Sequence, residues 1–299
     1  MVDRVDETSY WMALHAVEGM GPITFRRLVS GFGSAKAAVE NHAAPAMAHI
    51  PNMTTAMREA IARIPEEISR WESLADKLRL RGVRIVRMGR PGYPAALMAL
   101  PNPPPLLYLL GDIAAVASRS VSIVGTRKPS DKGKALATQF AARFAADGLS
   151  VVSGYAHGID AAAHRGAFDA GGRSILCLPY GIVNFKSRAD FPDIATIGRN
   201  GAIISECPPE QEWTSASAIA RNRIIAALGE ALLVIETPVK GGTMHTVKAA
   251  QELRRPIFAV QYQNPSDAAR GNSVLIARGA IPIETFADIR KVTQTLRLS

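Results

Sequence analysis

Short apolar runs that alternate with helical segments are the feature that most constrains the fold of this chain. From residue 83 onward these runs are VRIVRM, LLYLL, VSIVG, SVVSG, SILCL, AIIS, ALLVIE, PIFAVQ and AIPI. Short, continuously apolar runs predict strands buried on both faces, and the intervening helices predict parallel connections. We therefore predict an α/β fold built on an extended Rossmann-like parallel sheet.

The first 80 residues have a different pattern. From residue 8 to residue 80, apolar side chains recur at helical spacing and no strand pattern interrupts them. The sequence thus predicts two domains, a small all-helical domain at 1–82 and the Rossmann-like domain at 83–299.

A glycine turn lies within the helical part. In VEGMGPITFRRLVSGFGS, Gly19, Gly21 and Pro22 separate two short helices, and Pro22 suits the first turn of the second. The segment resembles a helix-hairpin-helix, in which such a turn offers backbone N–H groups to a DNA phosphate. A plain helical bundle that uses the glycines only to turn explains the pattern equally well.

The charge is basic and uneven. The net charge is +9, and residues 1–115 contribute +2 (13 basic minus 11 acidic) while residues 116–299 contribute +7 (22 minus 15). A polyanionic partner, most simply nucleic acid, is one interpretation, and a solubilising surface surplus is the other.

The sequence favours the cytoplasm. Cys177 and Cys207 have neither metal-ligand spacing nor a disulfide framework, which fits a reducing compartment. The first residues are acidic where a signal peptide is basic, and no apolar run reaches the roughly 18 residues that a membrane span needs. We expect neither export nor membrane insertion.

Two strand–glycine–helix joints predict a phosphate site. After the strand at 121–124 come Gly125, Thr126, Arg127 and Ser130, which offer backbone amides, two hydroxyls and a forked cation. Neither the phosphate-loop motif of NTPases nor G-x-G-x-x-G is present, so we predict no nucleotide or nicotinamide cofactor.

The second joint adds Ser153 and Gly154, and Arg173 precedes the next strand. We expect Arg173 to lean over the same carboxyl-end edge of the sheet.

Two later segments extend this site. Arg221, Asn222 and Arg223 are expected at the start of a helix, where cations oppose the helix dipole and call for an anionic partner. Gly241, Gly242 and Thr243 follow another strand and open a further helix. The sequence therefore predicts a groove wide enough for a strand of nucleotides, lined by four arginines: Arg127, Arg173, Arg221 and Arg223.

Three titratable residues lie close together in the sequence: His157, Asp160 and His164. A metal or acid–base site is one interpretation. We favour a structural one, with Asp160 as a helix N-cap and His164 on the same helix face, because no further ligand has suitable spacing.

Several motifs together resemble one family. IVGTRKPS, VVSGYAHGIDAAAH, GGRSILCLPYGI, ISECPP, ARNRIIAAL, GGTMHT and GNSVLIARGA occur in this order and look like DNA-processing protein A (DprA, also called Smf) over residues 83–289. The N-terminal part is similar to the sterile-alpha-motif-like or helix-hairpin-helix region of that family.

The resemblance implies a function. Members bind single-stranded DNA, form homodimers and load a RecA-type recombinase during DNA uptake, without an established catalytic activity. Carried onto this chain, the resemblance implies DNA contacts at Gly125, Thr126, Arg127, Ser130, Ser153, Gly154, Arg173, Arg221, Asn222, Arg223, Gly241, Gly242 and Thr243.

The chain departs from the family pattern in places. Ala218 and Ile219 replace an aromatic residue and a proline, so a base-stacking side chain is missing unless Trp213 substitutes for it. NFKSRAD replaces a Tyr-Pro loop, where Phe185 could fill the space. His157 replaces a basic residue, and a C-terminal winged-helix-like domain is not expected after Asp288.

A rival interpretation is a nucleotide sensor or a LOG-like phosphoribohydrolase of the same fold group. KGGTMHT is distantly similar to the PGGxGTxxE motif of those enzymes. Their chemistry needs a carboxylate on the motif helix, whereas Met244 to Lys248 contain none.

Overall fold

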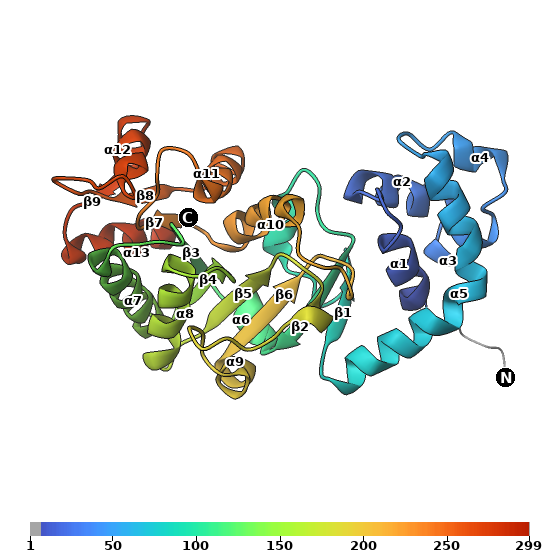
Figure 1. The fold of residues 1–299 in the computed structure, drawn as a ribbon, viewed down its shortest axis with the longest axis horizontal. Helices are drawn as coiled ribbons and strands as arrows, with labels where there is room; N and C mark the ends of the chain where they lie inside the picture. Colours follow the sequence, from blue (N-terminus) through green and yellow to red (C-terminus); the bar gives the residue numbers. More distant parts are fainter. Residues whose placement is uncertain (1–6, 299) are drawn as a thin grey trace. The chain divides into compact units, whose positions relative to one another are not determined.

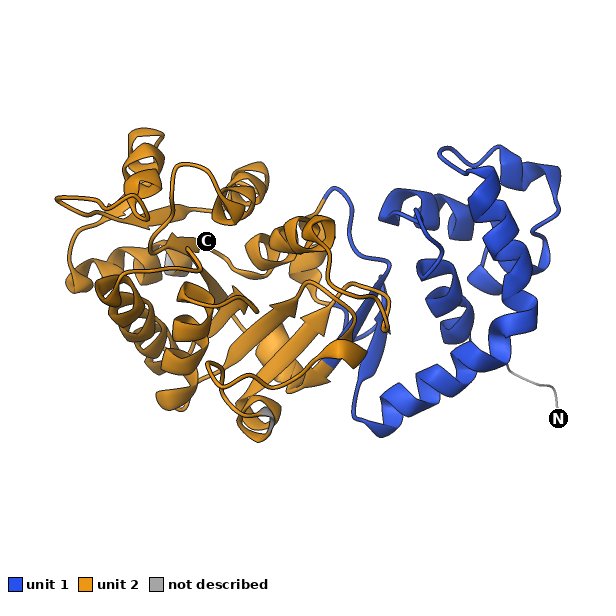
Figure 2. Ribbon diagram, in the orientation of Figure 1, with its two compact units in different colours: residues 1–93, 101–109 blue, residues 94–100, 110–299 orange. Residues whose placement is uncertain are grey.

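The chain forms two compact units. The computed structural model describes residues 7–298 (Figure 1), and it groups residues 1–93 and 101–109 as unit 1 and residues 94–100 and 110–299 as unit 2 (Figure 2). The division after residue 93 lies beyond the boundary at 82 that the sequence suggested, because unit 1 includes strand β1 (Arg84–Arg87) and most of β2 (Leu106–Gly111).

Helices fill the first part of unit 1, as the periodicity predicted. Thr54 caps the longest helix by accepting a hydrogen bond from Met57 N (3.1 Å), and Glu7 accepts one from Ala35 N (2.7 Å) at the start of another. The helices are α1 (Glu7–His15), α2 (Pro22–Phe32), α3 (Ala35–Glu40), α4 (Pro45–Ala48) and α5 (Thr55–Leu80).

The turn between α1 and α2 has the expected glycine geometry. Gly19 has a φ of 82°, and Pro22 is the first residue of α2. The Gly21 N–H donates to Gly19 O at 2.8 Å, so this amide is used inside the turn.

A nine-stranded sheet runs through the α/β part, in the order β1-β2-β6-β5-β4-β3-β7-β8-β9. The pair β1–β2 is antiparallel, and the pairs from β6 through β9 are parallel. The mostly parallel sheet predicted from the sequence is confirmed. The remaining strands are β3 (Ser120–Val124), β4 (Ser150–Gly154), β5 (Ser174–Leu178), β6 (Gly201–Ser205), β7 (Leu232–Val234), β8 (Ile257–Val260) and β9 (Ile281–Ile283).

Helices cover both faces of the sheet in unit 2. In Figure 1, α7 (Asp131–Ala146), α8 (Ile159–Asp169) and α13 (Ile289–Leu298) lie on one face, and α10 (Ser215–Leu228) and α11 (Gly242–Glu252) on the other. The shorter elements are α6 (Ile113–Ala117), α9 (Ile194–Asn200), α12 (Arg270–Ala277) and the 3₁₀ turns η1 (Ala95–Ala99), η2 (Ile182–Asn184) and η3 (Phe286–Asp288).

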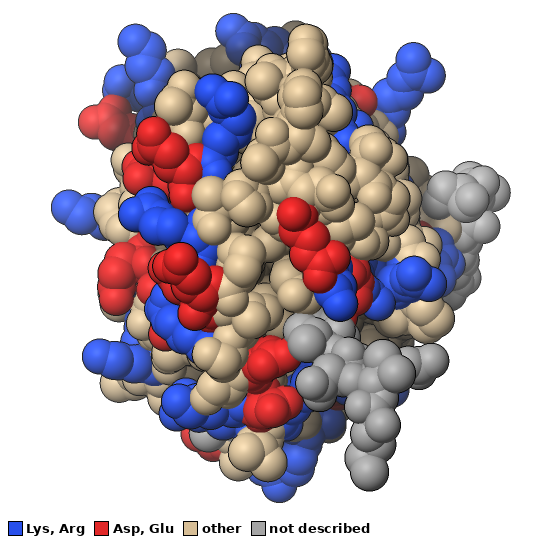
Figure 3. Space-filling view, turned by 90° about the vertical axis from the view of Figure 1, so that its right-hand side faces the viewer, with Lys and Arg blue, Asp and Glu red and all other residues tan. Residues whose placement is uncertain are grey.

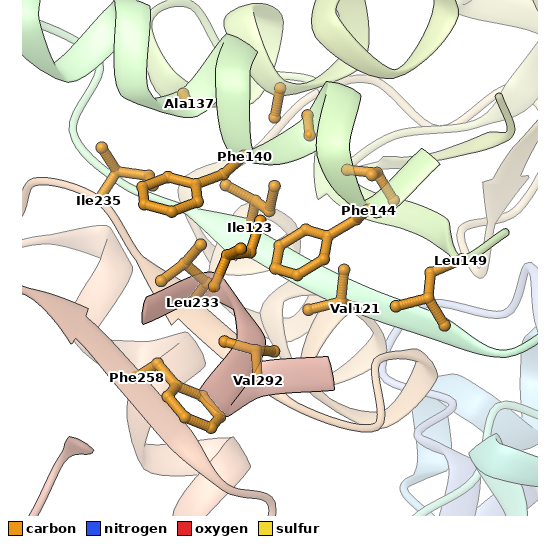
Figure 4. Close-up of a cluster of buried hydrophobic side chains, with 14 of the residues drawn as sticks. Val121, Ile123, Ala137, Phe140, Phe144, Leu149, Leu233, Ile235, Phe258 and Val292 are labelled. Carbon is orange, nitrogen blue, oxygen red and sulfur yellow. The ribbon is translucent and has the colours of Figure 1, made fainter. Parts of the chain in front are cut away.

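A dense apolar core joins α7 to the sheet (Figure 4). Phe140 and Phe144 of α7 pack onto Val121 and Ile123 of β3, and all four side chains are buried. Such burial contributes about 1.5–3 kcal/mol for each large side chain. This core fixes where β3 ends and α7 begins, which positions the loop between them.

Candidate nucleic-acid interface

The strand order reverses between β3 and β7. Along the chain, β3 to β6 add strands in one direction and β7 to β9 add them in the other. In open parallel sheets, ligands bind outside the carboxyl ends of the strands at this switch point. The loops after β3, β4, β5 and β7 all leave from this carboxyl edge, because these strands are parallel.

The β3–α7 loop is closed by a carboxylate. Glu236, just after β7, accepts hydrogen bonds from Ser130 N (2.8 Å) and Ser130 Oγ (2.5 Å). Ser130 Oγ in turn accepts from Gly133 N (3.0 Å) and so caps α7. The Ser130 hydroxyl, which we expected to contact phosphate, is therefore already hydrogen-bonded within the protein.

The backbone of this loop also fits closely against its neighbours. Thr126 N donates to Glu236 O (2.7 Å), and a Cβ on Gly125 would lie 2.5 Å from Ile159 Cγ1. Arg127 and Lys128 project from the loop into solvent. Neither of them forms an ion pair within the described residues.

The β4–α8 loop is shaped by internal contacts. Ser153 is buried and donates through Oγ to Ile123 O (2.6 Å). A Cβ on Gly154 would lie 2.4 Å from an Arg221 nitrogen, so a side chain there would displace the guanidinium. Both predicted contacts thus have a demonstrable structural role.

His164 and Asp160 belong to this internal structure. His164 hydrogen-bonds to Gly154 O through Nε2 and to Ser174 Oγ through Nδ1, both at 2.7 Å, and burial lowers its pKa to about 4. Asp160 is not the N-cap that we predicted, because Gly158 takes that position with a φ of 82°. No cluster of three or more His, Cys, Asp or Glu side chains suited to a metal occurs in the part of the chain that the structure describes.

Arg221 is buried beside Asp160. It is 5% exposed, and it donates to Cys177 O from the middle of α10. Burial raises the pKa of Asp160, and the Arg221 guanidinium opposes this shift. Through its bond to Cys177 O, at the end of β5, Arg221 links α10 to the carboxyl edge of the sheet.

The predicted start of this helix is also wrong. Thr214 is the N-cap of α10 and pairs with Ser217 in a capping box, so the helix begins six residues before Arg221. The cations therefore do not lie at the positive end of the dipole. Arg223 is paired with Glu206, and Asn222 Nδ2 donates to Gly242 O (3.2 Å), which links α10 to α11.

Arg173 lies at the opposite edge of the sheet. It immediately precedes β5, its carbonyl accepts from Val151 N (2.9 Å) at the start of β4, and its guanidinium is 3.6 Å from Asp112. The expectation that Arg173 joins the carboxyl edge is wrong, because a residue before a parallel strand lies at the amino edge. The four arginines do not line one groove.

The β7–α11 joint is more open. Gly241 and Gly242 are exposed, no side chain caps α11, and Lys240 beside them is exposed. Thr243 is 8% exposed and faces inward.

The loop after η2 packs on aromatic rings. Phe185 and Phe191 lie 5.3 and 4.2 Å from the Tyr155 ring, and the Arg188 guanidinium lies over Tyr155 and Phe191. Lys186 in the same loop is exposed. Phe185 therefore does fill space here, on Tyr155.

One exposed aromatic side chain lies at this edge. Trp213 is 51% exposed and directly precedes the α10 cap. Ser217 Oγ donates to Pro179 O (2.6 Å), and Gly181 N donates to Gln211 O (2.8 Å), so the segment that carries Trp213 runs along the carboxyl end of β5.

The sequence reasoning overlooked Lys128, Lys186, Lys240 and Glu236. The lysines could have been found, since each follows a predicted strand within a loop at its carboxyl end. The role of Glu236 depends on a contact across 106 residues, which no local pattern signals.

The comparisons with known proteins agree with the fold. A family model described as DNA recombination-mediator protein A matches residues 84–294. The chain belongs to this family. The resemblance that the motifs indicated is thereby confirmed, and a second model, the DprA-like N-terminal HHH domain, matches residues 5–69.

Relatives in this family cover most of the chain. Protein Smf from Synechocystis is 33% identical over 92% of this chain and 69% of its own length, and DprA from Bacillus subtilis is 29% identical over 80% and 83%. The structure of Streptococcus pneumoniae DprA matches with a TM-score of 0.70 at 23% identity, over 95% of this chain and 97% of that one. Helicobacter pylori DprA matches with a TM-score of 0.61 at 28% identity, over 72% and 95%.

The surface of unit 1 carries charges of both signs. Figure 3 faces the side on which unit 1 is drawn in Figure 1, and there Lys and Arg alternate with Asp and Glu around a large area of other residues. This mixed surface fits the small net charge of the first 115 residues. Among the described helices, none is both long and apolar enough to cross a membrane.

Proposed function

We propose that this protein binds single-stranded DNA along the carboxyl edge of the sheet in unit 2. The observation that carries the proposal is a set of exposed cations on loops of this edge, without ion-pair partners among the described residues, together with one exposed aromatic ring: Arg127, Lys128, Lys186, Lys240 and Trp213. The Helicobacter pylori relative was studied for its single-stranded DNA binding mode, which supports the same partner class here.

The side chains along this edge suit single-stranded DNA better than the reading of base pairs in a duplex. Cations on separate loops can contact successive phosphates, and an exposed indole can stack on any base. Binding of this kind is largely independent of base sequence and weakens steeply with salt. The exposed Gly241 and Gly242 add backbone amides near Lys240.

The buried polar residues have a supporting role in this proposal. Arg221, Asn222, Arg223, Ser130 and Ser153 hold the loops in place through their internal hydrogen bonds and ion pairs, and Arg127 contacts the strand directly. Arg173 takes no part, since it lies at the amino edge. The proposal assigns no catalytic residue, metal or cofactor.

The family relationship extends the proposal to partners. We propose that the protein acts in the cytoplasm as a homodimer, protects incoming or processed strands and assists a RecA-type recombinase in binding them. Sedimentation of the purified protein and strand-exchange assays with a recombinase test these two parts separately.

Fluorescence anisotropy of labelled poly-dT across a salt series tests the proposed binding. We expect tight binding whose affinity falls by about 0.7 log units per log unit of salt for each phosphate contact, with little competition from AMP or duplex DNA. Failure to bind poly-dT would overturn the proposal, and retention of AMP instead would favour the nucleotide-sensor or phosphoribohydrolase alternative.

A further inference from the structure

We propose that Glu236 is a specificity-determining residue. Its carboxylate fills the joint between β3 and α7, at the point where the strand order reverses, and so prevents a nucleotide phosphate from binding there. This inference rests on the proposed function in one respect, that single-stranded DNA is the ligand of the carboxyl edge. The exclusion of a nucleotide phosphate by Glu236 follows from the geometry of the joint alone.

The position of Glu236 is the place where this fold usually holds a ligand. β3 and β7 are adjacent and parallel, with Val124 opposite Val234, and the strand order reverses between them. The crevice outside their carboxyl ends is the expected ligand site of an open parallel sheet. Glu236 follows β7 by two residues and is 1% exposed, so its side chain fills this crevice rather than lining its rim.

Two donors at the start of α7 that could hold a phosphate are already used, namely the amide and the hydroxyl of Ser130. At a strand–helix joint, a phosphate binds the first amides of the helix and nearby hydroxyls. Here the Glu236 carboxylate accepts from both the amide and the hydroxyl of Ser130, which is the N-cap of the 16-residue helix α7. Its negative charge also complements the positive end of the helix dipole.

Gly133 shows how closely the carboxylate is seated. A Cβ at this position would lie 2.5 Å from Glu236 Cδ, so only glycine leaves room for the carboxylate against the first turn of α7. The joint is thus filled sterically and also carries a charge of the same sign as a phosphate.

This arrangement distinguishes two kinds of ligand. A mononucleotide depends on one closed phosphate pocket, which Glu236 occupies. A strand depends on several separated phosphates, which Arg127, Lys128 and Lys240 can contact outside the filled joint. Glu236 therefore disfavours the binding of a mononucleotide, whereas the cations on the carboxyl edge of the sheet stay accessible to single-stranded DNA.

The test compares Glu236→Ala with Glu236→Gln and the unaltered protein. Thermal unfolding is measured in chloride, acetate and phosphate at matched ionic strength, with and without AMP. In Glu236→Ala the vacated donors should accept an added anion, so acetate, phosphate or AMP should raise the melting temperature by about 3 °C more than in the unaltered protein. Glu236→Gln keeps the space filled and should show no such gain.

Three results would overturn the inference. These are a folded Glu236→Ala variant that no anion stabilises selectively, AMP binding by Glu236→Gln, and saturable AMP binding by the unaltered protein that Ser130→Ala abolishes. The last two remain measurable if Glu236→Ala does not fold. Poly-dT binding by the unaltered protein in the same buffers reports on the proposed function separately.

Discussion

At the scale of single residues, the environment of each arginine decides its role. Arg127 is exposed and without an ion-pair partner among the described residues, Arg221 is buried beside Asp160, and Arg223 is paired with Glu206. Arg173 is exposed but lies at the other edge. Only the first of these combines the charge, the exposure and the position that a strand contact at the carboxyl edge requires.

Trp213→Ala should weaken poly-dT binding without changing its salt dependence. Loss of one base stack costs about 1–3 kcal/mol, which is roughly a 5- to 150-fold loss of affinity, and removes no charge. Anisotropy titrations at several salt concentrations measure both quantities. Phe286→Ala, which changes a 42% exposed ring after β9, is the control and should bind normally. An unchanged affinity in Trp213→Ala would remove the indole from the interface.

Asp160→Ala should destabilise unit 2. The substitution removes the negative charge that most favours the charged form of the buried Arg221 guanidinium, so we expect a loss of about 1–3 kcal/mol. Asp147→Ala, which breaks the more exposed pair with Arg143, should cost less than about 1 kcal/mol. Urea unfolding compares the two variants, and equal losses would contradict a supporting role for Asp160.

At the scale of elements, local sequence patterns predicted those structures that depend on residues close together in the chain. The strands and their glycine ends follow from apolar runs and turn residues, which act over a few positions. The start of α10 was misplaced because the capping box at Thr214 and Ser217 was overlooked, although both residues are visible in the sequence. The burial of Arg221 could not be predicted, since it depends on Asp160 and Cys177 from other elements.

The contact between α7 and α8 gives a prediction at this scale. A Cβ on Gly166 would lie 2.2 Å from Thr138 O, so the two helices pack at backbone distance. Gly166→Ala should therefore lower the free energy of unfolding by about 1–3 kcal/mol or more. Gly198→Ala in α9, where a Cβ meets nothing within 4 Å, should instead be neutral or stabilising by about 0.5–1 kcal/mol. Chemical denaturation of both variants decides the matter, and a tolerated Gly166→Ala would contradict the packing.

At the scale of the whole molecule, acid should reduce stability through His164. Its pKa is about 4 in the folded protein and 6.5 when it is free of burial, so below pH 6.5 the unfolded chain takes up a proton that the folded chain does not. The free energy of unfolding should fall by up to about 1.4 kcal/mol per pH unit between pH 6.5 and 4 from this residue. Denaturation of the unaltered protein and of His164→Gln across this range should show a smaller slope in the variant, whereas exposed His245→Gln should leave it unchanged. Equal slopes in all three proteins would refute the assignment.

The overall organisation was largely predictable from the sequence, and the composition of the site was not. Hydrophobic periodicity separates the helical part from the sheet, because the two structures bury side chains at different spacings. The position of Arg173 was misjudged although strand polarity alone decides it. The closure of the first joint by Glu236 required the pairing of β3 with β7, a contact between segments far apart in the chain.

The central claim is that a DNA strand binds at the carboxyl edge of the sheet, and one comparison tests it most directly. Poly-dT affinity is measured across a salt series for the unaltered protein, Arg127→Ala and Arg173→Ala, two exposed arginines at opposite edges. We expect Arg127→Ala to lose roughly tenfold in affinity and about 0.7 of the salt slope, and Arg173→Ala to bind normally. Normal binding by a folded Arg127→Ala variant, with a loss in Arg173→Ala, would place the strand at the other edge and contradict this account.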